Sequence, residues 1–219
     1  MLQVRDEVPG RAPWIVLGLA AANLVVFAGE LWITAGPDGD ARALELFETW
    51  GLVPRKLLRG AEAAVWLTPL SAMFLHVDAL HLLGNLACLA VFGSPMEALF
   101  GRWRFLVLYL ACGLAAAAAQ VASVPSSWDA SIGASGPVAG VLGAYAVSVP
   151  LGRLRLARPR VELPALVFLV GWIAIQLHSG VGGEVTGVAW AAHLGGFASG
   201  VGLGWAMWVT KPTHSDLRI

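Results

Sequence analysis

The chain has 219 residues, of which 58% are hydrophobic and only 13% are charged, and its formal net charge is zero. An ordinary soluble domain carries about 25% charged residues, so this composition argues against a soluble protein and favours a membrane protein. A neutral chain also gives no reason to expect nucleic acid as a partner. Its ten tryptophans and 26 glycines fit the same class, because membrane proteins place Trp at interfaces and Gly at helix contacts.

Charged residues divide the chain into charge-free windows that are each at least 18 residues long. The windows are 12–29, 79–96, 105–128, 130–152, 163–183 and 185–210. A membrane-spanning helix needs roughly 20 mainly apolar residues, so six spans are expected. The expected fold class is therefore all-α: a polytopic membrane protein with a six-helix domain over 14–210, between short cytoplasmic tails at 1–13 and 211–219.

In chain order, each window predicts one helix. The expected helices run over about 14–33, 77–93, 105–123, 135–150, 164–178 and 188–209. The first apolar run is longer than the roughly 7–15-residue core of a signal peptide and five more runs follow, so we expect it to be retained. The long connection 34–78 is rich in Trp, Leu and Phe, which predicts an amphipathic element at the membrane interface rather than a flexible linker.

Lysine and arginine residues predict the orientation. With the N-terminus inside, the inner segments carry ten of them, including four arginines between 153 and 160. The outer segments carry the remaining four, all within 34–78. Because cytoplasmic segments of membrane proteins are enriched in Lys and Arg, both termini are expected in the cytoplasm.

Several polar residues lie inside the windows at similar depth. His81 is the third residue of its window, Ser135 the sixth and His193 the ninth. The three helices run in the same direction, so a rise of about 1.5 Å per residue places these residues within roughly 10 Å of each other in depth. Asn85 follows His81 by four positions and shares its helix face. Polar groups at such depth are costly, so they are candidates for a functional site.

Small residues predict which helices pack together. They recur at intervals of four in the last helix, at Ala192, Gly196, Gly200 and Gly204, and in the fourth helix, at Gly136 and Gly140. Such stripes allow helix backbones to approach closely. The fourth and sixth helices are therefore expected to pack face to face and to set His193 beside Ser135.

The chemistry of these residues fits nucleophilic catalysis. A serine hydroxyl is a weak nucleophile until a base takes its proton, and histidine is the commonest base near neutral pH. The oxyanion that forms needs hydrogen-bond donors, which Asn85, His81 and the free backbone N–H of Ser135 offer. No carboxylate lies in these three windows, so the residues allow a serine–histidine dyad.

These residues resemble a known family, the rhomboid intramembrane serine proteases in their basic six-helix bacterial form. The matching segments are Phe74-Leu75-His76 with His81-Leu82-Leu83-Gly84-Asn85, then Gly133-Ala134-Ser135-Gly136, then Ala192-His193-Leu194-Gly195-Gly196 with Gly200; Trp172 and Gln176 are weaker matches. The resemblance covers about residues 50–205 in the correct order and spacing. Three motifs in register make it specific, whereas one motif alone is weak.

The resemblance implies that Ser135 is the nucleophile and His193 the general base. It also implies an oxyanion hole made by His81, Asn85 and the Ser135 N–H. His76 takes a structural or water-organising role near the cavity mouth, and the supporting glycines are Gly133, Gly136, Gly196 and Gly200. Ala139 stands where some members carry a tyrosine that stacks on the catalytic histidine, so other packing must orient that ring.

The resemblance further implies the partners and the location. Substrates are single-span or polytopic membrane proteins in the lipid bilayer, cut beside a small residue near the outer face, with no cofactor and no metal ion. The fifth helix and the loop 179–187 gate access. A bacterial cytoplasmic (inner) membrane is the expected location.

Two other functions compete with proteolysis. One is a non-catalytic rhomboid-like protein that binds or escorts membrane clients; such relatives usually lose the serine or the histidine, and this chain keeps both. The other is metal binding or transport through His76, His81 and His193, although no carboxylate or thiolate cluster accompanies them. Reaction of Ser135 with a mechanism-based serine inhibitor separates these functions. A gap above about 5 Å between the Ser135 hydroxyl and the His193 ring argues against catalysis.

Overall fold

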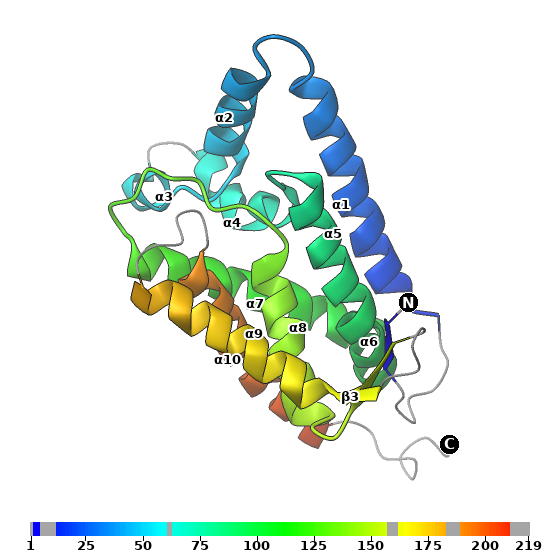
Figure 1. The fold of residues 1–219 in the computed structure, drawn as a ribbon. Helices are drawn as coiled ribbons and strands as arrows, with labels where there is room; N and C mark the ends of the chain where they lie inside the picture. The colour runs from blue at the N-terminus through cyan, green and yellow to red at the C-terminus, as the bar shows by residue number, and fades with distance from the viewer. Residues whose placement is uncertain (1, 5–11, 61–62, 157–161, 183–188, 211–219) are drawn as a thin grey trace.

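The structure is a computed structural model that describes residues 2–4, 12–60, 63–156, 162–182 and 189–210 (Figure 1). Each expected membrane window contains a helix. The long helices are α1 (Trp14–Ile33), the continuous run of α5 (Ala79–Cys88), the π-helical η3 (Leu89–Gly93) and α6 (Ser94–Phe100), then α7 (Arg102–Ser123), α8 (Ser135–Ser148), α9 (Ala165–Gly182) and α10 (Trp190–Val209). The predicted all-α, polytopic fold class is confirmed.

Among the described helices, α1, the run from α5 to α6, and α7 are long and apolar enough to cross a membrane. Helix α8 has only 14 residues, fewer than the roughly 20 of a typical span. It lies in the middle of the molecule, where other helices cover it rather than lipid (Figure 1). The number of spans therefore stays a prediction.

The second helical run is longer than expected because a charged residue lies inside it. Glu97 is buried, and its carboxylate accepts hydrogen bonds from the backbone N–H groups of Ile15 and Val16, at 3.0 and 2.9 Å. These N–H groups belong to the first turn of α1 and have no partner within that helix. The turn to α7 is correspondingly short, and Gly101 makes it with a φ of +84°.

Helices α8 and α10 form the predicted small-residue contact. Every residue of α8 from Gly136 to Tyr145 is buried. A Cβ atom added at Gly196 would collide with the carbonyl oxygen of Gly136, and one at Gly200 would collide with the backbone of Gly140. The two backbones touch here, so only glycine fits, and the predicted packing of the fourth and sixth helices is confirmed.

The connection before α5 is built from short helices. They are α2 (Gly39–Trp50), α3 (Pro54–Arg59), the 3₁₀ helices η1 (Ala63–Leu67) and η2 (Ala72–Phe74), and α4 (Thr68–Ser71) between them. Leu52 exchanges two backbone hydrogen bonds with Ser131, and the guanidinium groups of Arg55 and Arg59 lie 5.3 and 5.1 Å from the Trp128 ring. The connection is thus fastened to the loop that leads into α8. Its position at a membrane interface stays a prediction.

A small antiparallel sheet was not expected from the sequence. Strand β2 (Arg153–Leu156) lies between β1 (Leu2–Val4) and β3 (Glu162–Pro164). Arginine and leucine alternate along β2, and Leu154 is buried while Arg153 is exposed, which is the period of a half-buried strand. Much of the two predicted tails, Arg158, Arg160 and residues 183–187 of the predicted gate loop lie outside the described residues.

Candidate active site

Ser135 and His193 meet where α8 and α10 begin. Ser135 is the first residue of α8, and His193 is the fourth residue of α10. The distance between Ser135 Oγ and His193 Nε2 is 2.7 Å, which is a hydrogen bond and lies well below the 5 Å limit set above. The backbones touch between Gly136 and Gly196, so the two side chains lie beside a close part of the helix contact.

The second ring nitrogen of His193, Nδ1, contacts α9. Nδ1 of His193 lies 2.6 Å from Oε1 of Gln176, a buried residue on α9. An amide oxygen only accepts hydrogen bonds, so Nδ1 carries the proton, and in the neutral ring Nε2 is left free to accept the Ser135 proton. Trp172 adds a ring contact, with its centroid 6.0 Å from that of His193. These two residues orient the histidine without the tyrosine that Ala139 replaces.

His81 lies against the loop that precedes Ser135. Gly133 has a φ of +120°, and a Cβ atom there would lie 2.7 and 2.8 Å from two atoms of the His81 ring and 3.6 Å from Ser135 Oγ. Glycine is therefore required at 133 both for the backbone conformation and for space. The structure brings His81, Gly133 and Ser135 together, as the sequence predicted.

Asn85 supplies an unused donor. It is 7% exposed, and its Nδ2 makes no hydrogen bond to any residue that the structure describes. A buried amide without a partner is uncommon, because desolvation without a hydrogen bond is costly. Asn85 lies one helical turn beyond His81 on α5, and α5 contacts α8. This N–H group can serve a group that is bound beside Ser135.

His76 supports the segment before α8 rather than the reacting pair. Its Nδ1 lies 3.2 Å from the Phe74 carbonyl oxygen, and its Nε2 lies 3.5 Å from the backbone nitrogen of Ala134. Burial and, after it, repulsion from His81 lower the pKa of His76 to about 4, which keeps the ring neutral. A neutral ring that donates from Nδ1 can accept at Nε2, so His76 can hold the Ala134 N–H.

A small cavity borders Ser135. Its volume is about 40 Å³. The nearby lining residues are Met73, Gly133, Ser135, Gly136, Ala116 and Ala192. Roughly 10–15 Å³ of such space is enough for one water molecule, so the cavity has room for water or a small side chain.

The fold and the site together define a polytopic helical membrane protein in which a serine and a histidine are hydrogen-bonded where the first turns of two packed helices meet. The model of the rhomboid domain matches residues 63–210, which is most of the chain and includes all three motifs. The chain belongs to the rhomboid family.

Relatives with this domain come from plants, bacteria and fungi. RHOMBOID-like protein 4 of Arabidopsis thaliana is 30% identical, over 89% of this chain and 52% of its own length. Rhomboid protease GluP of Bacillus subtilis is 27% identical, over 87% of this chain and 34% of its own length. Rhomboid-type serine protease 2 of Emericella nidulans is 32% identical, over 64% of this chain and 26% of its own length. The chain thus spans about half the length of the first relative and less of the other two.

Proposed function

We propose that this protein is an intramembrane serine endopeptidase that cleaves transmembrane-helix substrates with Ser135 as nucleophile and His193 as general base. The observation that carries the proposal is the hydrogen bond of 2.7 Å between Ser135 Oγ and His193 Nε2. Two relatives named as rhomboid proteases support it as well.

The reaction follows from the positions of the two side chains. His193 Nε2 takes the hydroxyl proton while Ser135 Oγ attacks the scissile carbonyl carbon. The imidazolium then gives that proton to the leaving amine, and an acyl-enzyme remains. In the second half, His193 removes a proton from a water molecule, whose oxygen attacks the ester carbonyl carbon; the imidazolium then returns the proton to Ser135 Oγ as the ester bond breaks and the acid product leaves. The Gln176 oxygen holds Nδ1–H throughout, so Nε2 handles the proton in each step.

The oxyanion is stabilised by donors around the start of α8. Asn85 brings its unpaired Nδ2, His81 brings a ring N–H, and Ser135 brings the backbone N–H of a first helical residue. Donors fixed before the reaction stabilise developing charge without reorganisation. Positive backbone charge at the start of α8 acts in the same direction.

The substrate is a membrane protein whose helix unwinds near the outer face. The small cavity beside Ser135 suits a residue such as alanine next to the cut bond. With both termini in the cytoplasm, the start of α8 faces the outer side, which places the cut in the outer half of a bacterial inner membrane.

Cleavage of a generic single-span substrate by the full chain in lipid vesicles tests the proposal. Ser135→Ala and His193→Ala are each expected to lower kcat at least about 10³-fold, and Asn85→Ala about 10²-fold. Ser94→Ala and His178→Ala are matched controls, because the Ser94 hydroxyl bonds Ala90 within its own helical run and His178 is exposed.

The same experiment separates the competing function. A fluorophosphonate probe is expected to label Ser135 in the unmodified chain and not in Ser135→Ala. If folded protein neither cleaves the substrate nor reacts with the probe, a client-binding role replaces proteolysis. Cleavage that survives Ser135→Ala would refute the assignment of the nucleophile.

A further inference from the structure

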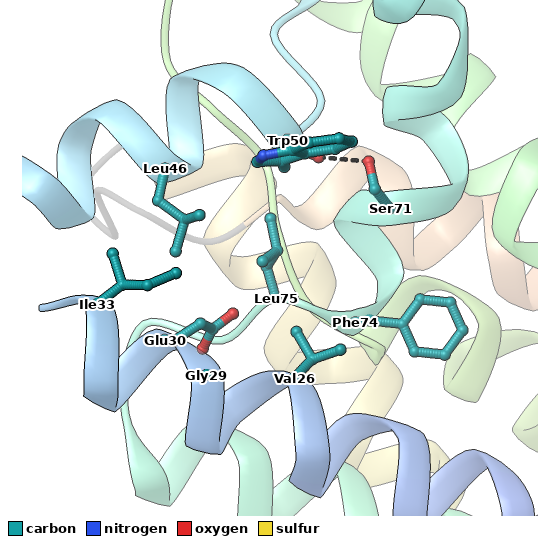
Figure 2. Close-up of a pocket in the computed structure, with 9 residues that line it drawn as sticks. All are labelled: Val26, Gly29, Glu30, Ile33, Leu46, Trp50, Ser71, Phe74 and Leu75. Atoms are coloured by element: carbon teal, nitrogen blue, oxygen red, sulfur yellow. Dashed lines mark hydrogen bonds between the residues drawn. The ribbon is translucent and has the colours of Figure 1, made fainter.

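Glu30 is a buried acid that has no part in the chemistry above. It lies near the C-terminal end of α1, and it is 5% exposed. Around it is an apolar cavity of about 330 Å³ between α1, α2 and η2. Figure 2 shows the Glu30 side chain rising from α1 towards the Leu75 segment. A carboxylate in such surroundings is costly unless hydrogen bonds satisfy it, so its partner matters.

Among the described residues, the Glu30 carboxylate has one hydrogen-bond partner, and it is a backbone group. The N–H of His76 donates to Glu30, with its nitrogen 3.1 Å from Oε1 and 3.4 Å from Oε2. His76 follows Leu75, whose ψ of 147° is extended, and precedes α5. Its N–H therefore has no carbonyl partner in a helix, and Glu30 takes that place. The bond joins α1 to the segment between η2 and α5.

From His76 the contacts continue to the serine. The His76 Nε2 faces the backbone nitrogen of Ala134 at 3.5 Å, and Ala134 is the residue before Ser135. The His76 ring also packs edge-on against His81, with their centroids 5.1 Å apart. Two groups of the proposed oxyanion hole, the His81 ring and the Ser135 N–H, thus rest on His76. Glu30 fixes the position of His76 from the far side.

We propose that Glu30 is a positioning residue for the serine centre: by holding the His76 N–H it fixes the layer formed by His76, His81 and Ala134, on which the oxyanion donors rest. The proposal rests on the proteolytic function given above. The role depends on an oxygen that accepts the His76 N–H. Glutamine has the same shape and an amide oxygen, so it can replace the carboxylate.

Three variants of the full chain in lipid vesicles test this role. Glu30→Ala removes the acceptor, Glu30→Gln keeps an acceptor oxygen, and Val26→Ala is the matched control. Val26 lines the same cavity on α1, and an apolar side chain cannot accept from His76. Kinetics on the single-span substrate give kcat and KM separately. Hydrogen–deuterium exchange of peptides covering 75–81 and 132–138 reports the segments directly, whether or not the chain cleaves.

Displacement of the oxyanion donors is expected to lower kcat. Glu30→Ala is expected to lower kcat between about 10- and 100-fold with KM changed less than about threefold, because small misplacements of reacting groups cost this much. Exchange in both peptides is expected to rise about tenfold. Glu30→Gln is expected to lie within about threefold of the unmodified chain, and Val26→Ala likewise.

Other outcomes overturn the proposal. If Glu30→Ala leaves exchange at 132–138 unchanged, Glu30 does not fix the layer. If Glu30→Ala and Val26→Ala lose kcat equally, Glu30 only fills space. If Glu30→Gln is as impaired as Glu30→Ala, charge rather than acceptor geometry is what matters, and the positioning role is wrong. Failure of the unmodified chain to cleave, by contrast, refutes the proteolytic function, while exchange still decides the role of Glu30.

Discussion

Replacing Gln176 by leucine tests how the proposed base is oriented. The substitution keeps the approximate shape and removes the oxygen that lies 2.6 Å from His193 Nδ1. A hydrogen bond from a neutral donor is worth about 0.5–1.5 kcal/mol, and one that involves a charged group about 1.5–3 kcal/mol. His193 is neutral before the reaction and positive in the transition state, so the bond strengthens by about 1–1.5 kcal/mol during the step. That difference corresponds to roughly tenfold in rate.

We therefore expect Gln176→Leu to lower kcat roughly tenfold and to leave KM nearly unchanged. Single-turnover cleavage of a single-span substrate in vesicles measures the chemical step. Leu177→Ala is the matched control, because Leu177 is the next residue of α9 and is 49% exposed. A Gln176→Leu variant that keeps kcat within about twofold would refute the reasoning, because the Nδ1 bond then contributes nothing to the transition state.

Two further predictions concern the framework of the site. Glu97→Ala is expected to lower the free energy of unfolding by about 2–4 kcal/mol, because two charge-assisted bonds to the N–H groups of Ile15 and Val16 are lost; a smaller loss in Glu97→Gln, measured by denaturant titration in detergent, is the check. Gly200→Ala is expected to lower the free energy of unfolding by about 1–3 kcal/mol and also to reduce the rate of cleavage. The added Cβ meets the backbone of Gly140 and pushes α10 away from α8. Unchanged stability and cleavage in Gly200→Ala contradict the close packing of these helices.

The positions of the helices and the contact of Ser135 with His193 could be predicted from the sequence. Charge-free windows locate helices because a bilayer tolerates few unpaired charges. The glycine stripes predicted the approach of α8 and α10, and the contact of Gly136 with Gly196 confirms it. Glu97 shows the limit of this reasoning: its partners lie about 80 positions away, so the sequence alone does not show that this charge is buried and paired within the helical run.

The partners of Gln176 and Glu30, two of the buried polar side chains, could not be predicted. Both lie in largely apolar helices, and the sequence does not show how those helices are rotated about their axes. Only the family resemblance indicates a role for Gln176. A polar residue within an apolar run, as Gln176, or directly after one, as Glu30, indicates a buried partner without naming it.

The choice of side chains at these two positions follows from the cost of charge in an apolar medium. Beside His193, a carboxylate must stay charged while the ring is neutral, without a full set of donors to satisfy it. An amide at Gln176 accepts the same Nδ1–H and carries no charge at any stage, so it orients the ring at lower cost. Glu30 differs because its oxygens lie 3.1 and 3.4 Å from a peptide nitrogen, whose charge does not change during the reaction. A neutral amide therefore suits the group that contacts the base, and the acid lies one layer away, where it acts on the backbone alone.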